Sequence, residues 1–134
     1  MLHQVKCQKN LTNSWTRETI LSQLNLTESE YREQTSLDLS SKDIINFDKN
    51  SFKNLTKLTS LDLSFNQLDC LDEILFRDLV NLEILNLSDD QIKSLPNSLF
   101  KGLSKLKSLF LGNNLMTSLS DKNFGGLISL ELLF

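Results

Sequence analysis

Large apolar side chains recur in this chain at a fixed interval of 24 residues, without a single insertion or deletion. One column holds Leu37, Leu61, Leu85, Leu109 and Leu133, and another holds Phe52, Phe76, Phe100 and Phe124. A period of roughly 20 to 50 residues indicates stacked repeats, because one unit cannot bury its own apolar face. The sequence therefore predicts one elongated domain with a continuous core, made of four units and the start of a fifth.

Each unit carries a short strand followed by a turn. The segment Leu61-Asp62-Leu63 alternates with period two, which predicts a strand with its leucines inward. Asn66 and Asn114 stand three residues after the strand, where an amide can bond main-chain groups that no strand satisfies. The rest of each unit returns behind the strands. Stacking then gives a parallel sheet with right-handed crossovers.

The unit Leu58-x-x-Leu61-x-Leu63-x-x-Asn66-x-Leu68-x-x-Leu71, with Phe76 and Leu79 following, resembles a leucine-rich repeat. The resemblance is to the 24-residue class that ends in a Phe-x-x-Leu return, and it covers residues 35 to 134. It implies an α/β solenoid whose short strands line a concave face used for protein binding. This class is most often found in extracellular receptors and adhesion proteins, although the chain itself shows no signal peptide.

The asparagine column departs from the pattern in two repeats. The first repeat has Lys42 at this position and the third has Asp90. A lysine has no acceptor and an ionised aspartate has no donor, so neither replaces an amide fully. We therefore expect complete amide bonding only in alternate repeats.

Residues 1–34 do not follow the 24-residue period and predict a helical N-terminal cap on the repeats at 35–134. Thr16 can cap a helix to about Leu24, with Trp15 and Ile20 placed as a hydrophobic staple. The segment 27–30, Thr-Glu-Ser-Glu, is a capping box that opens a shorter helix to about residue 33. Terminal caps cover the open end of a solenoid core, so we expect a structural role for this segment.

The last residues, Glu131 to Phe134, begin a fifth strand in register. The edge of the parallel sheet and part of the apolar core would be left uncovered there. We interpret the chain as a fragment or truncated product, and we expect self-association through this C-terminal end.

Catalysis finds little support, and we expect no enzyme, no cofactor and no metal site. The only histidine is His3, so imidazole chemistry and the usual nucleophile triads lack a member. The paired acids Asp89 and Asp90 fit solvated or turn-bonding residues better than a catalytic dyad. The four glycines fall at repeat positions, not in a phosphate-binding loop.

Charge and hydropathy limit the partners. The formal net charge of −3 comes from scattered acids and bases, and no Lys/Arg-rich run is present that would predict nucleic acid binding. No apolar stretch approaches the roughly 20 residues of a membrane span. We therefore expect a protein partner, with no nucleic acid and no membrane span in this chain.

The cysteines and glycosylation motifs leave the compartment open. Cys7 and Cys70 are far apart, and a disulfide between them would require the N-terminus to fold back along the side, so we do not expect one. Four Asn-x-Ser/Thr motifs occur, hardly more than composition alone would give. They begin at Asn10, Asn25, Asn54 and Asn86.

The outward positions of the strands and of the turns behind them form the candidate binding site. These positions hold Asp38, Asp62, Phe65, Ile84, Asn86, Asp89, Phe110, Asn113 and Phe134. Neighbouring strands lie about 4.8 Å apart, so Ile84, Phe110, Leu132 and Phe134 can form one apolar patch. The acids favour a basic partner and would speed its encounter.

We predict a protein-protein interaction module that binds a macromolecular partner on its concave face, as part of a receptor or adhesion ectodomain. The alternative is an intracellular scaffold or regulatory protein. Glycans on Asn10 or Asn54 would favour the ectodomain, and a reduced, unglycosylated product would favour the scaffold.

Overall fold

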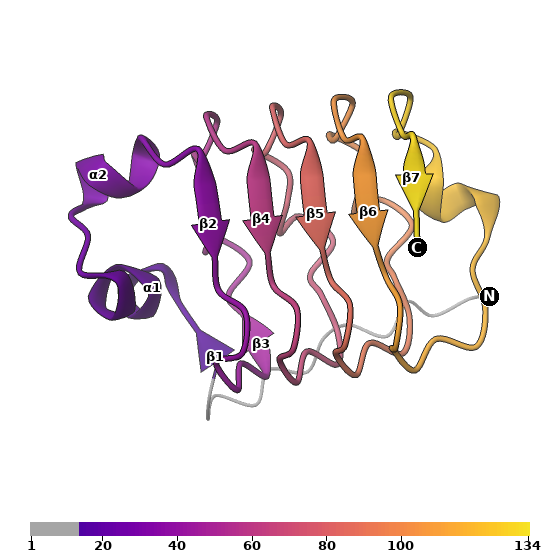
Figure 1. The fold of residues 1–134 in the computed structure, drawn as a ribbon, viewed down its shortest axis with the longest axis horizontal. Helices are drawn as coiled ribbons and strands as arrows, with labels where there is room; N and C mark the ends of the chain where they lie inside the picture. The colour runs from indigo at the N-terminus through magenta and orange to yellow at the C-terminus, as the bar shows by residue number, and fades with distance from the viewer. Residues whose placement is uncertain (1–13) are drawn as a thin grey trace.

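A computed structural model describes residues 14–134, in which a five-stranded parallel sheet is the largest element. The sheet order is β2 (Ser36–Asp38), β4 (Ser60–Asp62), β5 (Ile84–Asn86), β6 (Ser108–Phe110) and β7 (Leu132–Leu133). Each strand is in register with the next at the repeat interval, as Leu61 is with Leu85. The strands stand side by side with the return segments behind them (Figure 1). The predicted parallel solenoid is confirmed.

The apolar columns form one continuous core. The inward leucines of β4 and β5, Leu61 and Leu85, are fully buried. Behind them the Phe column stacks in two pairs, with ring centroids 6.2 Å apart between Phe52 and Phe76 and 6.4 Å apart between Phe100 and Phe124. Because the buried residues of all the repeats form one cluster, the core runs along the solenoid and not within single repeats.

The turn asparagines bond main-chain groups, as predicted, and some of these groups belong to the previous repeat. Asn66 Oδ1 accepts from the main-chain N–H groups of Lys42 and Ile44, at 3.0 and 3.1 Å. Its Nδ2 donates to the carbonyl oxygen of Leu63 at 2.9 Å. Asn114 repeats this pattern, accepting from the previous repeat and donating to its own. The third repeat has Asp90 in this place.

Two helices lie beside β2 at the N-terminal end of the sheet (Figure 1). Thr16 caps α1 (Arg17–Leu24), and Thr27 forms a capping box with Glu30 at the start of α2 (Glu28–Arg32). Both caps were predicted, because they depend on local sequence alone. The pairing of β1 (Ser14–Trp15) with β3 (Asn46–Phe47) was not predicted.

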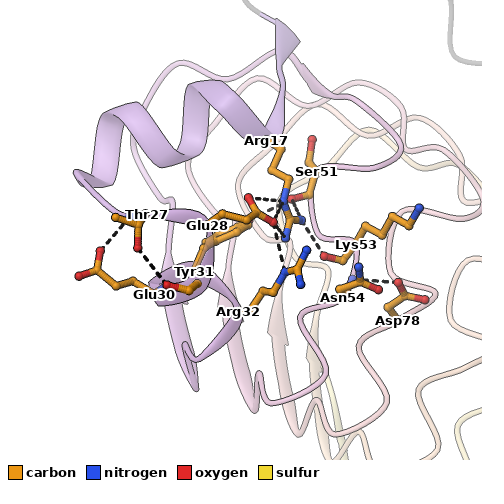
Figure 2. Close-up of polar contacts among 11 residues, drawn as sticks. Arg17, Thr27, Glu28, Glu30, Tyr31, Arg32, Ser51, Lys53, Asn54 and Asp78 are labelled. Atoms are coloured by element: carbon orange, nitrogen blue, oxygen red, sulfur yellow. Dashed lines mark hydrogen bonds and ion pairs between the residues drawn. The ribbon is translucent and has the colours of Figure 1, made fainter.

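Arg17 and Tyr31 tie the helices to the first repeat, and Figure 2 shows their contacts. The Arg17 guanidinium pairs with Glu28, with Nη2 2.7 Å from Oε1, and it donates to the Lys53 carbonyl at 2.6 Å. It also lies over the Tyr31 ring, 4.8 Å from its centroid. The Tyr31 hydroxyl donates to the carbonyl oxygen of Ser51 at 3.0 Å. The helices are thus held by polar contacts, of which the Tyr31–Ser51 hydrogen bond is buried, as well as by apolar packing.

Cys70 is disulfide-bonded in the structure, against our expectation from the sequence. The other cysteine of the chain, Cys7, lies outside the described residues. The expectation rested on the need for close Cα atoms, and the sequence alone does not set the distance between the two cysteines in space.

Over residues 14–134, no helix combines the length and apolar character that crossing a membrane would require.

Candidate functional site

We call the outward side of the sheet, together with the turns that follow its strands, the strand face. It contains all nine residues of the predicted site, on β2, β4, β5 and β6, in the turns and at the C-terminal residue. Phe65, Ile84 and Phe134 are exposed large hydrophobic residues, whereas Phe110 is half-buried. Polar members of the face are exposed or half-buried as well.

The predicted apolar patch is only partly continuous. Phe110 and Phe134 stack, with ring centroids 5.1 Å apart and ring planes 5° from parallel. Ile84 instead pairs in register with Ser108, while Phe110 pairs with Asn86. A serine therefore stands directly opposite the isoleucine, and a small side chain there leaves room for a partner to approach the sheet.

An Asp or Asn at the end of β2, β4 and β5 forms a turn that sequence reasoning missed. Asp38 Oδ1 accepts from the main-chain N–H and the hydroxyl of Ser40, at 2.9 and 2.6 Å. Asp62 bonds Ser64 in the same way, and Asn86 bonds Ser88. An Asx residue two positions before a serine is the signal that could have found it. One oxygen of each acid is thus occupied within the chain.

The carboxylate of Asp38 nevertheless keeps its charge. Hydrogen bonds from the Ser40 side chain and main chain hold its pKa below the ordinary value, and Lys42 lowers it further. Farther along the strand face, Asn113 Nδ2 donates to Asp89 Oδ1 at 2.9 Å, which orients that acid as well. Asp38 is therefore negative at neutral pH, and the carboxyl groups of Asp38, Asp62 and Asp89 are oriented by hydrogen bonds.

The third residue after the end of β2, β4, β5 and β6 adopts a left-handed conformation. Ser41, Phe65, Asp89 and Asn113 have φ values of 56°, 55°, 57° and 55°. Asn and Asp suit this region because their short side chains bond locally, whereas a bulky side chain is disfavoured there. Phe65 is also 61 % exposed, so little burial offsets its conformational cost.

The leucine-rich-repeat profile matches residues 33–92 and 81–134. The chain belongs to the leucine-rich-repeat family. A leucine-rich-repeat domain of this kind is in general an interaction module.

Solved structures share this leucine-rich-repeat fold. A chain from the Toll–Spatzle complex of Drosophila is 33 % identical, with a TM-score of 0.68 over 71 % of this chain and 12 % of that one. A chain from the TLR13–ssRNA13 complex is 27 % identical, with a TM-score of 0.76 over 89 % of this chain and 20 % of that one. The leucine-rich-repeat domain of APL1B, 23 % identical with a TM-score of 0.73 over 98 % of this chain and 35 % of that one, shows the fold alone.

This leucine-rich-repeat chain thus spans between 12 % and 35 % of the length of those three chains. Among curated protein sequences, none matches it.

Proposed function

We propose that the chain is a non-catalytic binding module whose concave strand face holds a basic protein partner. The observation that carries this proposal is Phe65, a large apolar side chain that is exposed in a backbone conformation that disfavours it. Residues kept in disfavoured conformations tend to cluster at functional sites. The equivalent positions in the next two repeats hold Asp89 and Asn113, which fit the same turn more easily.

The strand face also offers a second aromatic anchor and a matching charge. Phe110 is half-buried between its neighbours, so little freedom is lost when it meets a partner. Aromatic residues of this kind dominate the energetics of interfaces. Asp38 and Asp62 supply a negative field, which favours a basic partner and speeds its encounter.

A receptor or adhesion ectodomain fits this module better than an intracellular scaffold. The disulfide of Cys70 supports an oxidising compartment, because such bonds are rare where thiols are kept reduced. Asn54 begins a glycosylation motif and is exposed. Mass spectrometry of the secreted protein should find Cys70 oxidised and Asn54 modified. A reduced Cys70 with an unmodified Asn54 would favour the scaffold.

The binding face can be tested by site-specific photo-crosslinking. A photoreactive amino acid at Ile84 probes the strand face, and one at Val80 is a matched control on the return segment, since the two side chains are 44 % and 45 % exposed. We expect one protein to be captured from Ile84 and not from Val80, and its capture to fail in the Phe65→Asn variant. Capture from Val80 alone would contradict the proposal. A captured partner that ribonuclease releases would be RNA and not protein, and it would also contradict the proposal.

With a partner identified, Phe110→Ala should weaken binding by about 2 kcal/mol or more, which is roughly 30-fold in Kd. Calorimetry would measure the loss, and an unchanged Tm would show that the domain still folds. Unchanged affinity would mean that Phe110 only packs on Phe134.

A further inference from the structure

Asp90 stands where the neighbouring repeats have Asn66 and Asn114. The two asparagines each use both ends of the amide. Oδ1 accepts from a main-chain N–H of the previous repeat, and Nδ2 donates to main-chain carbonyls of its own and the previous repeat. A side chain at this position therefore needs an acceptor atom and a donor atom.

An ionised Asp90 satisfies only half of this requirement. Its Oδ1 accepts from the main-chain N–H of Leu68 at 3.0 Å, just as Asn66 accepts from Ile44. Its Oδ2 is buried and has no hydrogen-bond partner among the described residues. The whole residue is only 6 % exposed, so water does not replace the missing partner freely.

The repeat itself indicates what surrounds Oδ2. Asn66 Nδ2 donates to the carbonyl oxygens of Leu39, Leu63 and Ser64. One repeat further along, the equivalent carbonyls are those of Leu63, Leu87 and Ser88. A second carboxylate oxygen facing carbonyl oxygens would be repelled, whereas a protonated one would donate to them.

We propose that Asp90 holds a proton on Oδ2 in the folded domain and donates it to main-chain carbonyl oxygens, as the asparagine amide does in the adjacent repeats. A neutral carboxyl group supplies one donor and one acceptor, which is what this position requires. The turn is then bonded in three consecutive repeats. This inference stands independently of the proposed function.

The electrostatic surroundings also favour the protonated form of Asp90. Burial raises the pKa of Asp90 to about 7, against the opposing effect of main-chain hydrogen bonds to the charged form. The charged groups that act on it are the carboxylates of Asp89 and Asp62, and both raise the pKa further. Within residues 14–134, no lysine or arginine forms an ion pair with Asp90.

A raised pKa links the proton to stability with a definite sign. Between the ordinary aspartate pKa of 3.8 and about 7, the folded domain keeps a proton that the unfolded chain has released. The stabilisation is complete below this window, falls as pH rises through it, and is lost above it. The domain is therefore strengthened by mild acid and weakened toward neutral and alkaline pH.

The proton can be observed directly by NMR. In the full chain labelled with ¹³C-aspartate, the carboxyl resonance of Asp90 should titrate with a midpoint near 7. A midpoint for Asp90 near the ordinary value of about 4 would overturn the proposal.

Urea unfolding at several pH values provides the matching stability test. Between about pH 5 and about pH 8, the unfolding equilibrium constant of the wild type should rise roughly 100-fold more than that of Asp90→Asn. Asp69→Asn should follow the wild type. The reciprocal variant Asn66→Asp should gain a second pH-dependent loss of the same sign. Parallel pH curves for the wild type and Asp90→Asn would overturn the proposal.

Discussion

At the turn after each strand ending, four repeats share one left-handed backbone conformation but present different side chains. Asn113 and Asp89 bond to each other there, and Phe65 projects as an exposed ring. The sequence identified Phe65 as an outward residue. It did not show the unfavourable backbone, because φ values are not visible in a hydrophobic pattern. The turn formed by Asp38 and Ser40 also escaped notice, although an Asx residue two positions before a serine is a signal for it.

Phe65→Asn should separate stability from binding. Asparagine fits the left-handed turn with less strain, so the free energy of unfolding should rise by up to about 1 kcal/mol. Affinity for the partner should fall because the anchor is gone. Chemical denaturation and calorimetry on the same protein would measure both. A variant that is destabilised, or one that binds as well as the wild type, would contradict the role proposed for Phe65.

Phe76→Ala tests the core at the same scale. The ring is fully buried and stacks on Phe52, so its removal should cost about 3 to 5 kcal/mol. Val80→Ala truncates an exposed apolar side chain in the same repeat and should change stability by less than about 0.5 kcal/mol. Equal shifts in Tm for the two variants would show that the assigned repeat register is wrong.

At the scale of elements, the locally coded helix caps of the N-terminal segment were predicted, and its long-range β1–β3 pairing was not. The capping residues Thr16 and Thr27 lie next to the helices that they start, so their effect can be read from neighbouring positions. The β1–β3 pair is only two residues long and joins segments more than thirty positions apart. No periodic pattern marks so short a strand. The contacts of Arg17 likewise depend on tertiary packing (Figure 2).

Arg17→Gln should loosen α1 and α2. The Arg17 side chain is only 16 % exposed, and it bonds both Glu28 and the Lys53 carbonyl. Losing charged hydrogen bonds of this kind costs about 1.5 to 3 kcal/mol. Hydrogen exchange in both helices should accelerate, while exchange in β5 stays unchanged. Arg77→Gln is the control, because the exposed Arg77 makes only a 3.8 Å contact with Asp78. Similar exchange in both variants would show that Arg17 does not hold the helices.

At the scale of the whole molecule, the repeat period predicted the solenoid because every unit constrains the same inward columns. The outward positions carry no such constraint, so the sequence proposed a site without locating its contacts. Asp90 combines both cases, because the repeat sets its position in the turn but does not set its protonation state. Sequence reasoning treated it as ionised and unable to replace an amide, whereas its burial favours the neutral acid. Protonation depends on the environment, and only the folded chain supplies it.

The central claim is that partners bind the strand face, and hydroxyl-radical footprinting with the crosslinked partner tests it most directly. The method reads side-chain accessibility at Phe65, Ile84 and Phe110, with Val80 and Ile128 as exposed reporters on the return segments. We predict that the partner protects the first three residues from oxidation and leaves the two reporters unchanged. Protection of Val80 and Ile128, with Phe65 and Phe110 oxidised as in the free protein, would contradict the account.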